Sequence, residues 1–528
     1  MAIRMCFKRV YGNRSICKRM EKKVTSSLVK SSLAITVVLL LSKTLSFARD
    51  MLLANYLGAS ELSDVFLASS GVLFLFTSFV RSPFATSYLP IATEHYLHDP
   101  EQGRSPFFGK IYSAALALGT IFLLAMLLFL RPLVELMVPG FSPEAKAQLT
   151  NLLFLQLPVV LFVMVSIVVF GNLRLLGRLS LAESSNGVIA LVYVLYLLLF
   201  RHHITAVGLG LSTVAAYGVS LFPYMATAAR GGIPLRLRRF SCKDPEIREI
   251  FLAMLPFLLS DCAKQVNSVV DRIVASLLDS GSVTIQSYAS KMTITEVGLI
   301  STAVSMVIFA QASRLSAEHD TGGLEELVSS GLKFVSFLVI PCCVGTILYR
   351  YEIISVLFGR GAFTQENVRL TANTMMIYAV GMLGTGIQDV LSRTMHATKH
   401  RKFPAMLGAG SVLLNTVLNL LLYRPFGVYG LAAASSAALL LKIPFYAVYT
   451  HRRVVPFTDG RGIVKSTFLT TALAFAACFL SLPVKSVVLD YTGSTLAGLL
   501  AGAAVAAALY LSAALLTQKD LRAKLLRR

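Results

Sequence analysis

About fourteen apolar runs, each long enough to cross a lipid bilayer as a helix, dominate the sequence. A hydrocarbon core about 30 Å thick needs roughly 20 helical residues, so each run predicts one membrane span. The predicted spans are 31–57, 64–81, 108–130, 149–172, 181–200, 204–227, 250–278, 285–312, 331–350, 370–392, 404–423, 428–449, 464–482 and 495–517. With 528 residues, 55% hydrophobic and only 14% charged, the chain is too apolar for a soluble protein of this length. The sequence therefore predicts an all-α polytopic membrane protein.

The positive charge of the chain follows its predicted loops. The formal net charge is +22, and about 35 Lys and Arg residues fall in alternate loops, against about 8 in the loops between them. Cytoplasmic loops of membrane proteins are enriched in Lys and Arg, so this alternation predicts an even number of spans and places both termini in the cytoplasm. It also explains the basic charge without a nucleic-acid partner.

Motifs of known enzymes and metal sites are absent from the sequence. The seven cysteines lie at positions 6, 17, 242, 262, 342, 343 and 478 without a CxxC pair, so neither a disulfide framework nor a zinc site is predicted. There is no GxxxxGKS/T, HExxH or GxSxG motif and no aspartate-rich metal loop. The apolar run after the basic first 30 residues is too long for the core of a secretory signal, so it is interpreted as a retained first helix. We expect no catalytic residue, cofactor or metal.

A weak internal repeat divides the chain into two halves. The segments Leu133–Thr150 and Ile353–Thr371 each run from an apolar helix end through Gly and Phe to a Ser or Thr, with Glu two residues later. An N-cap followed by an acidic first turn has this pattern, so both segments are expected to start equivalent helices. Each follows an outward-going helix, which predicts two pseudo-symmetric six-helix lobes related by an axis along the membrane normal, plus two C-terminal helices.

The predicted divisions of the chain follow from this repeat and from the linker composition. They are a basic cytoplasmic segment 1–30, an N-terminal lobe 31–230, a cytoplasmic linker 231–249, a C-terminal lobe 250–450, the last two spans within 451–517, and a basic cytoplasmic tail 518–528. A site shared between repeats normally lies where they face each other, near the middle of the membrane.

About six basic residues fall inside predicted spans, where an ionised side chain costs about 2.5 to 3.5 kcal/mol at the bilayer centre. They are Lys43, Arg49, Lys264, Arg272, Lys291 and Lys442. The first five lie on spans one, seven and eight, and spans one and seven are the equivalent first helices of the two lobes. Because such charges normally face a bundle interior or a watery cavity, positive charge is predicted where the lobes meet. Lys442 stands alone near the cytoplasmic end of its span and is interpreted as structural.

Polar residues share helix faces with these cations. Ser42, Ser46 and Arg49 share one side of span one, Lys43 and Asp50 another, Lys264 lies with Asp261 and Asp271, Lys291 lies with Thr295, and Asp64 opens span two. Internal salt bridges, such as Arg49 with Asp64 or Lys264 with Asp271, are one explanation. However, the few carboxylates present do not neutralise five cations, so we also expect a positive cavity that suits a phosphate or pyrophosphate head group.

The run LSKTLSFARDMLLANYLGASELSDVFLAS, from Leu41 to Ser69, resembles the first two helices of the MurJ/MviN family of lipid II flippases, in the multidrug/oligosaccharidyl-lipid/polysaccharide exporter superfamily. The family pattern S-R-x-x-G-x-x-R-D, a Gly-Ala turn and D-x-F is matched by Ser42, Lys43, Arg49, Asp50, Gly58-Ala59, Asp64 and Phe66. VPGFSPEA, the GNLRLLGRLSL turn at 171–181, SGSVTIQSYASKM at 280–292 and LFGRGAFT at 357–364 also resemble family landmarks in order and spacing. The resemblance covers spans one to twelve.

The resemblance implies a fourteen-helix, V-shaped transporter that works by alternating access. Its cationic cavity would receive the pyrophosphate and sugar of an undecaprenyl-linked precursor, and spans thirteen and fourteen would form a groove for the lipid tail. The family's cavity arginines fall on Lys43, Arg49 and Lys291, and its acid falls on Asp64. Lys keeps the charge at two of these positions but loses the bidentate fork that suits phosphate oxygens.

A second departure from the family pattern lies on the second helix. Where the family has a further arginine and an E-G-A-F segment, this chain has Thr77 and then Arg81-Ser82-Pro83-Phe84-Ala85. Arg81 would substitute for the missing arginine from about one turn away. The missing Glu-Gly leaves room for a related lipid-linked oligosaccharide as substrate.

We therefore expect a monomeric, multi-pass flippase of the bacterial cytoplasmic membrane, with membrane lipids around it. It would move a polyprenyl-pyrophosphate-linked saccharide, lipid II before others, from the inner to the outer leaflet. The expected roles are pyrophosphate binding by Lys43, Arg49 and Lys291, added positive potential from Arg272 and Lys264, head-group contacts from Ser42, Ser46 and Thr295, and gating or charge pairing by Asp50, Asp64, Asp271 and Arg81. A coupling ion or the membrane potential would supply energy, at about 2.3 kcal/mol per charge per 100 mV.

Three alternatives stay open at this point. One is a flippase for an exopolysaccharide or O-antigen unit, which would use the same kind of cavity. Another is a cation-coupled drug extruder, which should prefer an acidic, aromatic-rich cavity. The third is a membrane glycan polymerase or ligase, which would need a large extracytoplasmic loop with catalytic side chains, whereas the predicted outside loops are short.

Overall fold

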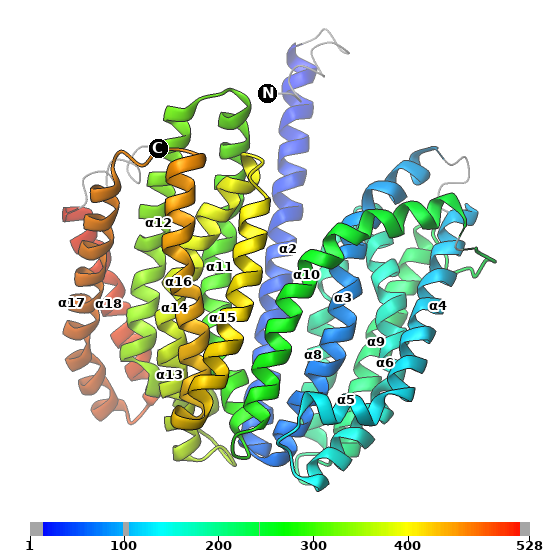
Figure 1. Ribbon diagram of the computed structural model, residues 1–528, viewed down its shortest axis with the longest axis horizontal. Helices are drawn as coiled ribbons and strands as arrows, with labels where there is room; N and C mark the ends of the chain where they lie inside the picture. The colour runs from blue at the N-terminus through cyan, green and yellow to red at the C-terminus, as the bar shows by residue number, and fades with distance from the viewer. Residues whose placement is uncertain (1–13, 99–104, 242, 518–528) are drawn as a thin grey trace. The chain divides into compact units, whose positions relative to one another are not determined.

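The computed structural model describes residues 14–98, 105–241 and 243–517, and within these ranges the regular structure is entirely helical. The helices, labelled in chain order in Figure 1, are α2 (Arg14–Leu57), α3 (Glu61–His98), α4 (Pro106–Leu128), α5 (Leu130–Met137), α6 (Pro143–Leu175), α7 (Leu179–Glu183), α8 (Ser185–Leu199), α9 (Ala206–Arg230), α10 (Pro245–Ser276), α11 (Ser282–Ala317), α12 (Thr321–Leu348), α13 (Arg350–Phe358), α14 (Gln365–Ala397), α15 (Lys402–Phe426), α16 (Val428–Arg453), α17 (Gly460–Thr492) and α18 (Thr495–Thr517). The all-α prediction is confirmed. The predicted tail 518–528 and the first part of segment 1–30 lie outside the described residues.

Fourteen helical segments of the described chain coincide with the fourteen predicted spans. Ten of them are long and apolar enough to cross a membrane, with α7 and α8 together forming one. The other four, α2, α3, α10 and α11, are 44, 38, 32 and 36 residues long. These four helices carry all of the predicted site residues.

The repeated N-cap pattern starts two helices as expected. The Ser142 hydroxyl accepts a hydrogen bond from the Ala145 N–H (3.0 Å) at the start of α6, and the Thr364 hydroxyl accepts one from the Asn367 N–H (3.3 Å) at the start of α14. An unpaired N–H at a helix start is satisfied in this way by a Ser or Thr side chain. Both helices run for 33 residues from these caps.

The chain forms two compact units that are interleaved in sequence. Unit 1 comprises Met1–Leu52, Phe76–Leu130 and Asn151–Leu258, and unit 2 comprises Leu53–Leu75, Arg131–Thr150 and Leu259–Arg528. Unit 2 therefore includes the end of α2, the start of α3 and the α5–α6 connection, in addition to the helices from α11 onward. The predicted lobe boundaries at 231–249 stay a prediction.

Small residues allow the helices of unit 2 to pack closely. A Cβ atom at Gly381 or Gly384 of α14 would lie 3.0 to 3.4 Å from atoms of Ser436, Leu439 and Leu440 on α16. Close approach at small residues is the usual basis of helix packing in membranes, where lipid is as apolar as the side chains. A separate cluster around Phe337, Ala474 and Tyr510 joins α12 to α17 and α18.

Helices α17 and α18 pack on each other, and α13 also contacts α18. Lys485 of α17 forms an ion pair with Glu352 of α13, and both side chains are mostly buried. The Lys485 ammonium also lies 5.6 Å from the centroid of the Tyr349 ring, whose hydroxyl bonds Ser481. These polar contacts attach the C-terminal helix pair to the rest of unit 2.

Candidate functional site

The predicted site residues of unit 1 lie on α2 and α3. Ser42 is 6% exposed and packs against α8, where a Cβ atom at Gly187 would lie 2.7 Å from its hydroxyl oxygen. The Ser46 hydroxyl donates to the Ser42 carbonyl within the same helix (2.9 Å). Lys43 is exposed. On α2, the two serines therefore contact protein, while the lysine side chain extends away from it.

Arg49 and Asp50 form a close ion pair on α2. The Arg49 guanidinium donates through Nε and Nη2 to Asp50 Oδ1, at 3.0 and 2.8 Å. Asp50 is buried at 2% exposure, whereas the Arg49 side chain is 25% exposed. The Arg49 Cζ atom also lies 5.6 Å from the centroid of the Tyr193 ring on α8. Asp50 thus bonds the guanidinium while part of the Arg49 side chain stays accessible.

Two tyrosines of α8 and α9 surround the cations of unit 1. The phenol of Tyr217 interacts electrostatically with both Arg49 and Arg81, and that of Tyr193 donates to Thr213 (2.8 Å). Arg81 itself is exposed. The phenol of Tyr217, on α9, is therefore within the electrostatic influence of both guanidinium groups.

In unit 2, Asp64 caps the start of α11 from a different helix. Its Oδ2 accepts a hydrogen bond from the Gly281 N–H (2.6 Å), and its Oδ1 accepts bonds from the N–H (2.8 Å) and the hydroxyl (2.6 Å) of Thr284. Helix α11 begins after Gly281 without a capping side chain of its own. A carboxylate stabilises the free N–H groups and the positive dipole at a helix N-terminus. Asp64 is buried at 2% exposure, so the contact excludes water.

Glycine backbones meet around this cap. The Ala362 N–H donates to the Asn55 carbonyl (2.8 Å). A Cβ atom at Gly58 (φ +63°) would overlap the carbonyl of Ala362, and one at Gly361 (φ +58°) would overlap that of Asn55. Glycine is therefore needed at both positions, because the backbone is left-handed there and because each glycine lies directly against the backbone of the other segment. We call this set of contacts the loop junction: residues 55–64, 281–284 and 361–362.

Arg272 and Asp271, adjacent on α10, have different surroundings. The Arg272 guanidinium lies directly on α3, in the space that a side chain at Gly71 would occupy. Asp271 accepts hydrogen bonds from Asn419 (2.6 Å) and Asn267 (3.2 Å). Asp271 thus has two amide donors, and its suggested pairing with Lys264 stays a prediction. The side chains of Lys264 and Asp261 lie outside the described residues.

On α11, Lys291 and Thr295 lie one turn apart as expected. Lys291 is half-buried, and the Thr295 hydroxyl donates to the Lys291 carbonyl (2.7 Å). Arg49 bonds Asp50, and Asp64 caps α11; the suggested Arg49–Asp64 salt bridge stays a prediction. The structure therefore brings Arg49 and Asp50 together in unit 1, and Asp64 together with the start of α11 in unit 2.

The chain matches the family model "Lipid II flippase MurJ" over residues 53–500. The chain belongs to the MurJ family. Among its relatives, the "Probable lipid II flippase MurJ" of Vibrio cholerae is 25% identical over 435 residues, covering 80% of this chain and 83% of the relative. That of Rhizobium tropici is 26% identical over 439 residues and covers 81% of each chain.

Solved structures show the same fold. The structure "Lipid II flippase MurJ, inward closed conformation" superposes with a TM-score of 0.76 at 21% identity, covering 93% of this chain and 99% of that one. An inward-facing multidrug transporter of the MATE family superposes with a TM-score of 0.63 at 15% identity, covering 80% and 95%. The MurJ fold, expected from the sequence, is confirmed.

Three polar features of this MurJ-family chain were missed by sequence reasoning. Tyr193 and Tyr217 are aromatic residues in apolar helices, and nothing in their spacing distinguishes them from core residues. Glu296, on α11, accepts a hydrogen bond from Thr346 of α12 (2.9 Å). Lys442 does not stand alone, because Asp389 of α14 attracts it electrostatically. A carboxylate inside a predicted span was the available signal for Glu296 and Asp389.

Proposed function

We propose that this protein is a flippase that moves lipid II from the inner to the outer leaflet of the bacterial cytoplasmic membrane. The observation that carries the proposal is the match to the lipid II flippase model over residues 53–500. The relatives that cover about four fifths of the chain carry the same name. The protein is a multi-pass transporter rather than an enzyme, and we propose that it acts as a monomer with both termini in the cytoplasm.

The proposed ligand of the predicted cations is the pyrophosphate of the lipid-linked saccharide. In unit 1, Lys43, Arg49 and Arg81 would supply the positive charge, and the exposed part of Arg49 is supported by its bond to Asp50. Guanidinium groups form paired hydrogen bonds with phosphate oxygens, and lysines act as point charges. A doubly anionic pyrophosphate therefore suits a wall with two arginines and one lysine.

In unit 2, Lys291 and Arg272 are the proposed contributors, with Lys264 as a further one whose side chain lies outside the described residues. Thr295, Ser42 and Ser46 remain proposed head-group contacts, although their hydroxyls bond or pack against protein in this state. Asp271 would act by fixing the α10 segment that carries Arg272, because its two amide partners hold it in place.

Asp64 is the proposed latch of a gate at the loop junction. With both termini in the cytoplasm, the ends of α2 and α10 and the start of α11 lie on the extracytoplasmic side. The buried Asp64 carboxylate accepts three hydrogen bonds and so defines a closed state of the loop junction. When the junction opens, water would form hydrogen bonds with the exposed carboxylate and with its former donors. Transport by alternating access requires a closed state that is stable but can be opened.

The proposed energy source is an ion gradient or the membrane potential. No ATP-binding motif is present in the sequence, and the potential contributes about 2.3 kcal/mol for each elementary charge that moves across 100 mV. Coupling of this kind would bias the population of the two states rather than the chemistry of the substrate.

A second substrate class is favoured by one specific observation. Thr77 and Arg81-Ser82 stand where the family pattern has an arginine and a Glu-Gly pair, and Arg81 interacts with the same tyrosine as Arg49. If Arg81 does not replace the missing arginine, another polyprenyl-pyrophosphate oligosaccharide, such as an exopolysaccharide unit, would fit the same charges.

Depletion with rescue tests the proposal. A host whose own lipid II flippase is depleted is given this chain, and lipid II exposed on the outer surface is measured. The expected result is rescue of growth and of lipid II exposure. Failure to rescue despite full membrane insertion, combined with rescue of an exopolysaccharide-flippase mutant, would assign the chain to the other substrate.

A further inference from the structure

The linker between α9 and α10 lies as an extended strap against α4. We define the strap as residues 232–241. It leaves α9 at Gly232 (φ +96°), and its Arg238 N–H donates to the Ser113 hydroxyl of α4 (2.9 Å). A Cβ atom at Gly109 would lie 2.8 Å from the Arg236 carbonyl. The strap therefore crosses α4 between Gly109 and Ser113, in direct contact with the helix.

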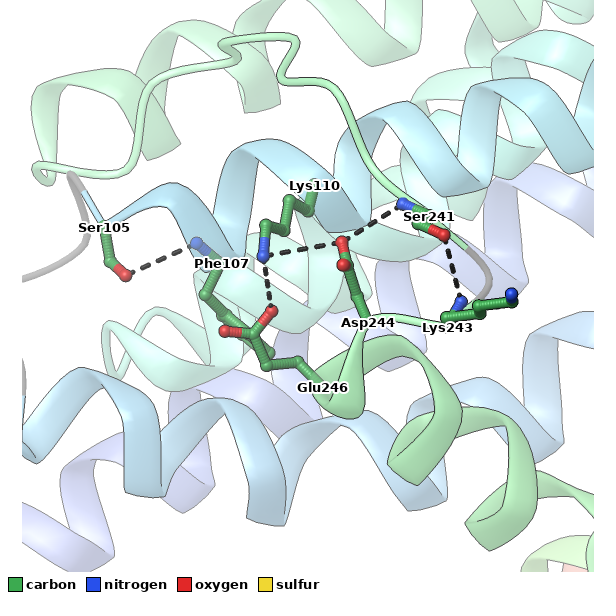
Figure 2. A network of polar contacts seen from close by, with 7 residues as sticks. All are labelled: Ser105, Phe107, Lys110, Ser241, Lys243, Asp244 and Glu246. Atoms are coloured by element: carbon green, nitrogen blue, oxygen red, sulfur yellow. Dashed lines mark hydrogen bonds and ion pairs between the residues drawn. The ribbon is translucent and has the colours of Figure 1, made fainter.

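An ionic network fixes the far end of the strap, as Figure 2 shows. Lys110 of α4 forms ion pairs with Glu246 (3.0 Å) and Asp244 (3.4 Å) at the start of α10. Asp244 in turn accepts a hydrogen bond from the Ser241 N–H (3.1 Å). Lys110 thus forms ion pairs with both acids and connects the start of α10 to α4.

The strap contacts α4 near the N-terminal end of this candidate membrane span. Helix α4 has 23 residues, which corresponds to about 34 Å at about 1.5 Å per residue, close to the hydrocarbon thickness of about 30 Å. The strap crosses this helix within its first two turns. Its backbone is therefore held against one end of a helix that is long and apolar enough to span the membrane.

The exposed side chains of the strap alternate between apolar and basic. Leu235 and Leu237 are 36% and 57% exposed, and Arg236, Arg238 and Arg239 are also exposed. Among the described residues, none of the three arginines has an ion-pair partner. Apolar side chains that enter the acyl boundary beside arginines that reach head-group phosphates are the chemistry of a segment bound to a membrane surface.

We propose that the strap is a binding site for anionic phospholipid head groups of the leaflet on the linker side of the membrane. The phosphodiester would be bound by the three arginines, and the two leucines would insert between the lipids. The general enrichment of Lys and Arg in cytoplasmic loops explains the charge, but it does not explain two exposed leucines in the same extended segment. This inference does not depend on the identity of the transported substrate.

The test is a titration of the purified full-length chain in neutral detergent with dioctanoyl phosphatidylglycerol, with dioctanoyl phosphatidylcholine for comparison. Each basic residue near an anionic surface strengthens binding about fivefold, so R236Q/R238Q/R239Q should weaken binding of the anionic lipid about 100-fold. The matched control is K399Q/R401Q/K402Q, which removes the same charge from three exposed positions in the loop after α14 and at the first residue of α15. It should change the affinity about twofold at most.

Hydrogen exchange locates the bound lipid. In nanodiscs of phosphatidylcholine and phosphatidylglycerol (2:1), the amides of residues 232–241 should exchange more slowly than in discs of phosphatidylcholine alone, and the strap triple variant should lose this difference. If that variant does not fold, Arg239→Gln alone should weaken binding about fivefold. Equal loss of affinity for phosphatidylglycerol in both triple variants would show an effect of net charge alone. Protection of the strap amides by inorganic pyrophosphate, without protection by phosphatidylglycerol, would assign the strap to the substrate head group. Either result overturns the proposal.

Discussion

The sharpest prediction concerns Asp64, the cap of α11. Asp64→Ala removes the two oxygens that accept three hydrogen bonds at 2.6 to 2.8 Å from Gly281 and Thr284. Asp64→Asn keeps the shape and one acceptor oxygen, but places an amide N–H₂ against a second donor. Both variants leave the rest of the loop junction unchanged, including the Ala362–Asn55 hydrogen bond.

The magnitude follows from the number and kind of bonds lost. A hydrogen bond to a charged group contributes about 1.5 to 3 kcal/mol, and a buried donor without a partner costs about 1 to 3 kcal/mol. Because water offsets part of this when the junction opens, we expect Asp64→Ala to destabilise the closed junction by about 3 to 4 kcal/mol. At about 1.4 kcal/mol for each factor of ten, the open population rises about 100- to 1,000-fold. Asp64→Asn should have about half this effect in free energy, or about 10- to 30-fold.

Hydrogen exchange of the Gly281 and Thr284 amides measures this opening directly. The matched control is Glu61→Ala, which removes an exposed carboxylate about one turn before Asp64 that accepts a hydrogen bond from the Ser142 hydroxyl (2.6 Å). The control should leave both amides within about threefold of the wild-type rate. Unchanged exchange in Asp64→Ala, or equal acceleration in Glu61→Ala, would refute the assignment of Asp64 as the latch.

Three further predictions follow from the same structure. Arg49→Ala should reduce transport at least about tenfold at equal expression, because truncating one partner of a hydrogen-bonded charge pair costs about 2 kcal/mol or more; transport at the wild-type rate would remove Arg49 from the site. Gly58→Ala should lower the apparent thermal midpoint of unfolding in detergent more than Gly493→Ala does. Both glycines have φ +63°, but only a Cβ atom at Gly58 would meet other atoms within 4 Å, those of Ala362. Equal shifts of the midpoint would contradict the close contact. A double-mutant cycle of Lys485→Met and Glu352→Gln should give a coupling free energy for stability of about 1 to 2 kcal/mol. The more exposed pair of Lys333 and Asp459 should give no measurable coupling. Similar coupling free energies for both pairs would contradict the role of burial.

The sequence was sufficient for the spans because each depends on local composition. Fourteen apolar runs became fourteen helical segments, and the caps at Ser142 and Thr364 formed where the repeat predicts them. These signals lie within a few residues of the structures they specify. The family resemblance was also local, because it rested on the stretch from Leu41 to Ser69 and a few shorter motifs.

The partners of the charged residues were harder to predict because they come from other helices. Asp64 was expected to be a gate or charge partner, but its donors lie 217 and 220 residues away in the chain. The partnership of Lys442 with Asp389 and that of Arg81 with Tyr217 likewise depend on how helices pack. Helical periodicity identifies which residues share a face of one helix, but it does not tell which helix that face will contact.

Reconstituted vesicles test the central claim most directly. Fluorescent lipid II is placed in both leaflets, and a membrane-impermeant reductant is added outside, so that only outward-facing label is quenched at once. With an imposed ion gradient or membrane potential, vesicles that contain the wild-type chain should lose nearly all of their fluorescence, whereas protein-free vesicles should keep about half. Arg49→Ala should behave like protein-free vesicles. Quenching that stops at half with the wild-type chain, under every gradient and potential tested, would contradict the proposal that this protein moves lipid II.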